Sequence, residues 1–410
     1  MILTKSRWLV LGASCLINLC IGLMYAWSVF VTPMAEHLSS IIGRQISSLA
    51  VVFTVANSVG PVTMISGGFI NDKLGPRWVI FAGGVLFGFG MFFSGFASSV
   101  GSLILTFGLG CGLGMGLVYG CTVSNTVKFF PDHRGLAGGL STASFGISSV
   151  IVPPVANFLM QSFGVTTTFK ILGIFIFLFI SILAFFITPC PSGFVPEGWK
   201  PVRNVTAKAG KEKNWKGMLL DPAFYIMLFL LCCGAFSGIM VISQASPVAQ
   251  RMTGMTVTSA AAVVSTLALL NTCGRVIAGF LFDKLGIVKT LLGIFTLSIV
   301  GLLALYLSKT GDILKFYTGI AAVGFAFGSI MGVFPAFTAF QFGAKNNSMN
   351  YGIMFTGFAV AGLFGPTIMS SIYSLTGNYR YAFFVAICLS VSGIALLVIY
   401  RLCVRLANKL

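Results

Sequence analysis

Long apolar runs recur along the whole 410-residue chain and constrain its fold more than any other feature. A helix that crosses the hydrocarbon core of a bilayer needs about 20 apolar residues. Hydrophobic residues make up 57% of the chain and charged residues only 8%, whereas a soluble domain carries about 25% charged residues. The sequence therefore predicts an all-α integral membrane protein. Its twelve predicted transmembrane helices are 7–32, 45–70, 77–98, 101–127, 136–161, 168–188, 222–249, 256–281, 287–308, 313–341, 350–374 and 379–403.

Basic residues are divided unevenly between the two sides that twelve spans define. The side that holds both termini carries 18 Lys and Arg residues, and the other side carries 6. Loops rich in Lys and Arg stay in the cytoplasm, so we expect a multi-pass protein of the cell (inner) membrane with cytoplasmic N- and C-termini. The net charge of +17 does not indicate nucleic-acid binding, because the sequence has no Lys/Arg-rich folded domain.

The longest loop, 189–221, is polar, basic and rich in proline. We interpret it as a cytoplasmic linker between an N-terminal six-helix bundle, 1–188, and a C-terminal six-helix bundle, 222–410. The ten cysteines lie mostly inside apolar runs and lack metal-ligand spacing. They are typical of reduced packing residues.

An internal repeat links the two predicted bundles. The pattern Gly-Phe-x-x-Asp-Lys-x-Gly follows the second span, where it contains Asp72, and the eighth span, where it contains Asp283. The two copies are 211 residues apart, about half of the chain. Such duplication is typical of transporters in which one half rocks against the other.

The repeated loops carry charges that suggest a conformational latch. An aspartate at a helix end can pair with cations and with the N-terminal amides of a helix. The candidate latch residues are Asp72, Lys73, Arg77, Asp283 and Lys284. The alternative is an ordinary solvated turn.

The repeated motif resembles that of the major facilitator superfamily, and the resemblance covers the whole chain. Three further stretches sharpen it: Tyr25-Ala26-Trp27-Ser28-Val29-Phe30, Phe129-Phe130-Pro131-Asp132-His133-Arg134-Gly135-Leu136-Ala137-Gly138-Gly139 and Asn350-Tyr351-Gly352. Together they resemble the oxalate–formate antiporter family, whose relatives include the monocarboxylate (lactate) transporters. This resemblance implies two pseudo-symmetric six-helix bundles and a transport function.

Arg275 is the one charged residue in the middle of a predicted span. No Asp, Glu or His lies within any predicted span. A central arginine is unfavourable by about 2.5–3.5 kcal/mol, so its counter-ion is predicted to be a diffusible anion such as a carboxylate. The residue 211 positions earlier is Met64, so the fold does not require this charge. The alternative is an arginine that snorkels or donates to carbonyls of a neighbouring span.

Other candidate substrate-binding residues accompany Arg275. Asn271 lies one helical turn before it, on the same face. The resemblance places Phe327, Met331, Phe355, Phe145, Tyr119 and Tyr25 at pocket positions, although packing is the alternative for each aromatic residue. It also puts Phe358 where the oxalate exchanger has a second cation, a lysine. One cation and an aromatic wall favour a monoanion over a dianion.

These residues favour a secondary active transporter that moves a small monocarboxylate, of the lactate or pyruvate type, by alternating access with protons. No intraspan acid can carry a proton, so the proton would travel with the substrate carboxyl or through a tyrosine. The alternative is a carboxylate anion exchanger of the oxalate–formate kind. An enzyme is disfavoured because the predicted spans contain no Asp, Glu or His that could form a catalytic site. A sensor with a transporter fold is a further alternative, and it would bind ligand without moving it across the membrane. We expect a monomer in the lipid bilayer that needs no cofactor or metal.

Overall fold

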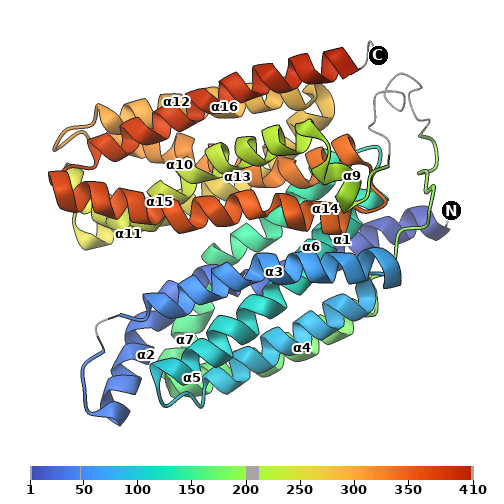
Figure 1. Ribbon diagram of the computed structural model, residues 1–410. Coiled ribbons are helices and arrows are strands. Elements are labelled where there is room, and N and C mark those ends of the chain that lie inside the picture. The colour runs from blue at the N-terminus through green and yellow to red at the C-terminus, as the bar shows by residue number, and fades with distance from the viewer. Residues whose placement is uncertain (1, 47, 200–211, 408–410) are drawn as a thin grey trace. The chain divides into compact units, whose positions relative to one another are not determined.

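The computed structural model describes residues 2–46, 48–199 and 212–407. Within these ranges the chain is helical and contains no strand (Figure 1). Residues 200–211, the middle of the predicted linker, lie outside the described residues. The chain divides into two compact units.

Unit 1 comprises Met1–Asp132, Ser144–Lys200 and Ala344–Ile353. Helix α6 packs against α1, α3 and α4. The elements are α1 (Ile2–Ile21), η1 (Gly22–Ala26), α2 (Trp27–Ile42), α3 (Ala50–Leu74), α4 (Pro76–Ser94), α5 (Val100–Leu103), η2 (Ile104–Cys111), α6 (Gly112–Phe129), most of α7 (Arg134–Ala184) and most of α14 (Asn347–Met354).

Unit 2 comprises His133–Ala143, Pro201–Gly343 and Met354–Leu410. Helix α13 packs against α10, α11 and α12, while α10 also packs against α15 and α16 (Figure 1). Besides the start of α7, the elements are α9 (Trp215–Leu219), α10 (Pro222–Thr253), α11 (Val257–Leu285), α12 (Ile287–Tyr306), α13 (Ile313–Phe342), α15 (Thr356–Thr376) and α16 (Arg380–Ala407).

Eleven helical segments of the described chain are long and apolar enough to cross a membrane. One of them, α7, has 51 residues and is broken at Gly164, whose φ of 77° and ψ of 164° are not helical. Glycine tolerates this conformation because it has no Cβ. Two helices therefore meet at Gly164, between the predicted spans 136–161 and 168–188, and the chain has the helices for twelve crossings.

Several helices differ in detail from the predicted spans. The first crossing continues through a 3₁₀ turn at Gly22–Ala26 and then through α2 to Ile42, ten residues beyond the predicted end. The fourth crossing contains a π-helical segment, Ile104–Cys111. The predicted linker contains a short helix, α9. Apolar runs do not reveal such changes of helical pitch, because pitch alters the backbone hydrogen bonds and not the residue types.

Glycines on α6 and η2 form a close contact with α3. Gly112 and Gly116 lie against the Ala56 and Gly60 carbonyls of α3, with no room for a side chain. Small residues at this spacing let helices approach closely in a membrane. The four-residue glycine spacing in the sequence thus corresponds to a helix-packing face.

Two short segments fall in a different unit from the predicted bundle. Residues 133–143, predicted in the N-terminal bundle, belong to unit 2, and residues 344–353, predicted in the C-terminal bundle, belong to unit 1. Each segment begins a helix whose amides are held by a carboxylate of its unit, as described below.

Candidate functional site

The Arg275 side chain is enclosed in unit 2 and is only 1% exposed. It projects from α11, where its Nε donates a hydrogen bond to Asn271 Oδ1 at 3.1 Å. Its Nη1 donates to the backbone carbonyl of Thr142 at 2.8 Å. Asn271 is thus placed as its position one turn earlier predicts, whereas the Thr142 contact is of the carbonyl type that the sequence left as an alternative.

Carboxylates do not neutralise Arg275 within the described residues. Four carboxylates form ion pairs with other cations, namely Asp72, Asp132, Asp221 and Asp312, and none of these pairs includes Arg275. A guanidinium has five N–H donors, and the contacts above use one at Nε and one at Nη1. Donor capacity therefore remains for a planar acceptor such as a carboxylate.

Close backbone packing fixes the position of Arg275. Gly139 at the start of α7 and Gly332 on α13 both lie against the Arg275 carbonyl, with no room for a side chain. Gly328 on α13 lies equally close to the Asn271 carbonyl. These contacts bring three backbones together around one turn of α11, so the guanidinium projects from a rigid support.

Three phenylalanines of unit 2 form an aromatic group. The Phe355 and Phe358 rings stack with centroids 4.6 Å apart, and the Phe327 ring stacks on Phe358 at 6.5 Å. Phe358 is partly exposed, whereas Phe327 and Phe355 are buried. Met331 lies one helical turn after Phe327 on α13 and is 2% exposed. Both residues lie in a stretch of α13, Ala326–Ala339, in which every residue is buried.

A second aromatic group lies in unit 1. The Phe145 ring of α7 meets Tyr25 of η1 at 4.9 Å and Tyr119 of α6 at 5.1 Å. Gly22 lies against the Phe145 carbonyl, which brings η1 close to α7. The structure therefore assembles the three aromatic residues that the sequence proposed for this half of the chain.

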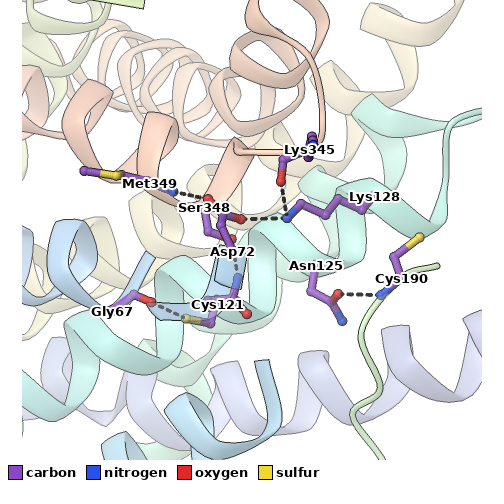
Figure 2. A network of polar contacts seen from close by, with 10 residues as sticks. Gly67, Asp72, Cys121, Asn125, Lys128, Cys190, Lys345, Ser348 and Met349 are labelled. Atoms are coloured by element: carbon purple, nitrogen blue, oxygen red, sulfur yellow. Dashed lines mark hydrogen bonds and ion pairs between the residues drawn. The ribbon is translucent and has the colours of Figure 1, made fainter. Parts of the chain in front are cut away.

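Asp72 in the last turn of α3 binds two different groups (Figure 2). Its Oδ1 accepts a hydrogen bond from Lys128 Nζ at 2.7 Å, and its Oδ2 accepts from the Met349 backbone amide in the first turn of α14 at 3.0 Å. Lys128 also donates to the Lys345 carbonyl, and the Asn71 amide donates to Ser348 Oγ. Unit 1 therefore contains a carboxylate at a helix N-terminus.

Asp283, the repeat equivalent of Asp72, makes the same kind of contact in unit 2. Its two carboxylate oxygens accept hydrogen bonds from the backbone amides of Gly135 and Leu136, each at 2.8 Å. These amides belong to the first turn of α7. A negative charge at this position satisfies otherwise unpaired donors and interacts favourably with the helix dipole.

The other candidate latch residues make different contacts from those expected. Lys73 Nζ lies over the Phe69 ring at 4.0 Å and Lys284 Nζ over the Phe280 ring at 4.5 Å, each one turn back on its own helix. Arg77 donates to the carbonyls of Phe185 and Ile187 after α7. The cation that pairs with Asp72 is Lys128. It directly follows the predicted span 101–127 but is not among the predicted latch residues.

Cys190 borders the same polar network. Its backbone amide donates to Asn125 Oδ1 at 3.3 Å (Figure 2). Asn125 Nδ2 in turn donates to the Thr188 carbonyl. Burial raises the pKa of the Cys190 thiol to about 11, because its effect is larger than the opposing effect of nearby Lys128. The thiol is therefore protonated at neutral pH, and it adds no negative charge beside Lys128.

A sequence profile of the Major Facilitator Superfamily matches residues 14–349. The chain belongs to this superfamily. The fold agrees: FucP, a superfamily transporter whose crystal structure was solved in an outward conformation, aligns with a TM-score of 0.75 over 96% of this chain and 99% of FucP. The two sequences are only 12% identical, so this likeness concerns the fold alone.

Relatives within the superfamily differ in what their names say they transport. The oxalate:formate antiporter of Oxalobacter formigenes is 28% identical, with 90% of this chain and 86% of the relative covered. Mouse (Mus musculus) monocarboxylate transporter 11 is 27% identical, covering 94% and 85%. The MFS-type transporter YhjX of Escherichia coli (strain K12) is also 27% identical, covering 88% and 86%. A probable nitrate transporter, NarT of Staphylococcus haemolyticus, is 26% identical over 90% of this chain and 90% of the relative. The protein is therefore a membrane transporter, and the names of its relatives leave its substrate open.

Proposed function

We propose that the protein moves a small monocarboxylate, of the lactate or pyruvate type, across the membrane by alternating access. The observation that carries this proposal is the buried Arg275 guanidinium, which has two protein hydrogen-bond acceptors but no carboxylate partner among the described residues. Burying a charge is unfavourable unless it is paired. A substrate carboxylate would supply the missing negative charge.

The side chains of unit 2 support a monoanion as the substrate. The sequence resemblance puts Phe358 where the oxalate exchanger has a second cation. The Phe358 ring stacks with the rings of Phe355 and Phe327. One guanidinium and an aromatic surface suit one carboxylate with a small apolar body. A bound monocarboxylate also neutralises Arg275, which lowers the electrostatic barrier to moving the loaded site through a low-dielectric interior.

Proton symport is the proposed coupling. Asp72 and Asp283 lie in the last turns of α3 and α11 and are engaged with helix amides. Neither of these carboxylates accompanies Arg275, so we propose that the proton travels with the substrate carboxyl or through a tyrosine such as Tyr25 or Tyr119.

Carboxylate exchange is the second candidate. The relationship to the oxalate:formate antiporter favours it, as does the position of these two aspartates at helix ends. Exchange needs no proton carrier. It predicts uptake that depends on a preloaded anion and is indifferent to an imposed pH gradient.

Uptake into proteoliposomes tests the function directly. Purified protein is assayed with lactate, pyruvate, formate and oxalate, with and without a pH gradient and with and without internal anion. We expect uptake of monocarboxylates that a pH gradient accelerates. Uptake that requires internal anion assigns exchange, and the absence of uptake of every carboxylate contradicts both candidates.

Variants of Arg275 test the site. Arg275→Ala and Arg275→Lys should each lower uptake by about tenfold or more, because a hydrogen bond to a charged group contributes about 1.5–3 kcal/mol. Lysine keeps the charge but loses the planar fork that matches a carboxylate. Lys315→Gln, which removes an exposed cation, is the control. Normal uptake by folded Arg275→Ala protein would remove Arg275 from the site.

A further inference from the structure

One end of unit 2 contains a polar cavity of about 300 Å³ that is separate from Arg275. It lies where α10 and α15 end and α16 begins, at the opposite end of α16 from its last described residue (Figure 1). Ten residues line it: Arg251, Met252, Ser308, Lys309, Thr310, Tyr373, Gly377, Asn378, Tyr379 and Arg380. Three of them are cations, and none is an acid.

The two arginines of the cavity are held in place by aromatic and backbone contacts. The Arg251 guanidinium lies 4.6 Å from the centroid of the Tyr373 ring, and its Nη1 donates to Tyr379 Oη at 3.2 Å. Those two tyrosine rings stack at 4.2 Å. Arg380 Nη2 donates to the Ser308 carbonyl at 3.2 Å. Each guanidinium keeps further N–H donors for a ligand.

Asp312, three residues after the lining residue Lys309, does not itself line the cavity. Asp312 accepts hydrogen bonds from Lys315 Nζ at 3.1 Å and from the Lys309 backbone amide at 3.2 Å. Hydrogen bonding to Lys315 lowers the pKa of Asp312, so this carboxylate is ionised at neutral pH and bound to a cation that does not line the cavity. Three cations line the cavity and Asp312 is one carboxylate, so the net charge around the cavity is positive.

The fold does not require these cations. The positions 211 residues earlier, by the repeat offset, are Ser40, Ser98 and Phe169, none of which is charged. The cations also lie on the side of the membrane that is predicted to be external, where Lys and Arg are scarce: Arg251, Lys309 and Arg380 are half of the six assigned to it. A concentration of positive charge on that side indicates a ligand.

We propose that this cavity is an oxyanion-binding site that captures the carboxylate of the transported anion before it reaches Arg275. The inference rests on the proposed function for the identity of the anion. Positively charged clefts raise the local concentration of an anionic substrate and its rate of association. Two guanidinium groups with fixed orientations bind a carboxylate, and the cavity accommodates one with a small apolar body.

Binding of pyruvate to purified protein in nanodiscs of neutral phosphatidylcholine tests the cavity directly. With Arg275→Ala protein, we expect weak, salt-sensitive pyruvate binding that the additional pair Arg251→Gln and Arg380→Gln removes. If the protein with both arginine substitutions does not fold, Lys309→Gln replaces them. This variant changes an exposed side chain and should weaken pyruvate binding. Lys289→Gln in the same background, which removes an exposed cation of α12 that does not line the cavity, is the matched control and should leave binding unchanged. Absence of binding to Arg275→Ala protein overturns the inference.

Uptake kinetics provide the second test. With Arg275 intact, the arginine pair should raise KM by about threefold to tenfold at low ionic strength while kcat changes little, and high salt should remove the difference. A KM equal to that of Lys289→Gln at low salt overturns the inference. If wild-type protein takes up no carboxylate, the proposed function fails, whereas nanodisc binding still decides the cavity.

A phosphate of a lipid headgroup is also an oxyanion. The nanodisc titration is therefore repeated with anionic phosphatidylglycerol present. We expect pyruvate binding to persist at matched ionic strength. Loss of binding that follows the lipid fraction assigns the cavity to a headgroup and contradicts capture of substrate.

Discussion

A guanidinium buried in a membrane protein needs acceptors for its N–H groups, and Arg275 has two of them. The Asn271 side chain and the Thr142 carbonyl each accept a hydrogen bond from the guanidinium, but neither carries a negative charge. A neutral pair of acceptors holds the side chain in one orientation without neutralising it. These contacts hold Arg275 in place, and under the proposed function the substrate anion neutralises its charge.

In the proposed site, a substitution at Phe358 should alter the preference for substrates of different charge. We expect Phe358→Lys to shift preference from monocarboxylates toward oxalate, because the variant restores a second cation to a partly exposed position that stacks on Phe355. Competition between labelled pyruvate and unlabelled oxalate in proteoliposomes measures the shift. Phe358→Leu, which removes the ring without adding charge, is the control. Unchanged selectivity would place residue 358 away from the substrate.

Residue types predicted some of these positions and not others. A lone charge in an apolar run identifies Arg275, and repeated letters identify Asp72 and Asp283. Thr142 contributes a backbone carbonyl, which every residue has, so its role leaves no sequence signal. Lys73 is adjacent to Asp72 in sequence, but helical spacing carries it back over Phe69, and the cation supplied is Lys128 from another helix.

At the level of helices, the duplicated loops do the same task in both units. Asp72 accepts from the first turn of α14, and Asp283 accepts from the first turn of α7. A carboxylate at a helix N-terminus contributes about 0.3–1 kcal/mol at exposed sites and more where it is partly buried. We propose that breaking these contacts accompanies the change between conformations.

Asparagine at either position tests the proposed latch. Asp72→Asn and Asp283→Asn should lower the maximal uptake rate several-fold while substrate affinity changes little, because both side chains bind the amides of helix N-termini. The measurements are kcat and KM in proteoliposomes and Kd for the purified protein. Asp312→Asn, the same change at an exposed carboxylate, is the control. A loss confined to affinity would argue against the latch.

Helix packing around Arg275 leads to a separate expectation. Gly139→Ala should destabilise the protein by about 1–3 kcal/mol, as overpacking does, and should reduce uptake, because a Cβ there meets the Arg275 carbonyl. Gly293→Ala on α12 is the matched control, since a Cβ at that site meets nothing within 4 Å. Thermal unfolding and uptake are measured for both variants. Equal behaviour of the two would show that this contact is not important for the site.

For the molecule as a whole, hydropathy and charge predict the number of spans and their direction. Twelve crossings follow from the apolar runs, and the structure confirms the helices, including the break near Gly164 that separates the fifth from the sixth. The placement of 133–143 and 344–353 could not be predicted, because it depends on amides meeting Asp283 and Asp72 across long sequence separations.

The orientation in the membrane is tested with reporters. A fluorescent protein fused after the C-terminus should be bright, because the positive-inside rule places that end in the cytoplasm. Alkaline phosphatase inserted in the loop at Thr310 should be active, because this loop is predicted to face outward. The same enzyme inserted at Gly198 should be inactive and serves as the comparison. The reverse pattern would invert every assignment of sides.

The hydrogen bond from Arg275 to the Thr142 carbonyl has a thermodynamic consequence. Thr142 lies at the point where α7 leaves unit 2, since the chain enters unit 1 at Ser144. If the proposed anion displaced this carbonyl from the guanidinium, α7 would be held less tightly to α11, and by reciprocity a displaced α7 would strengthen binding of the anion. Occupancy of the proposed site and the position of α7 would then depend on one equilibrium. The Thr142 carbonyl would couple binding of the anion to movement of the helix.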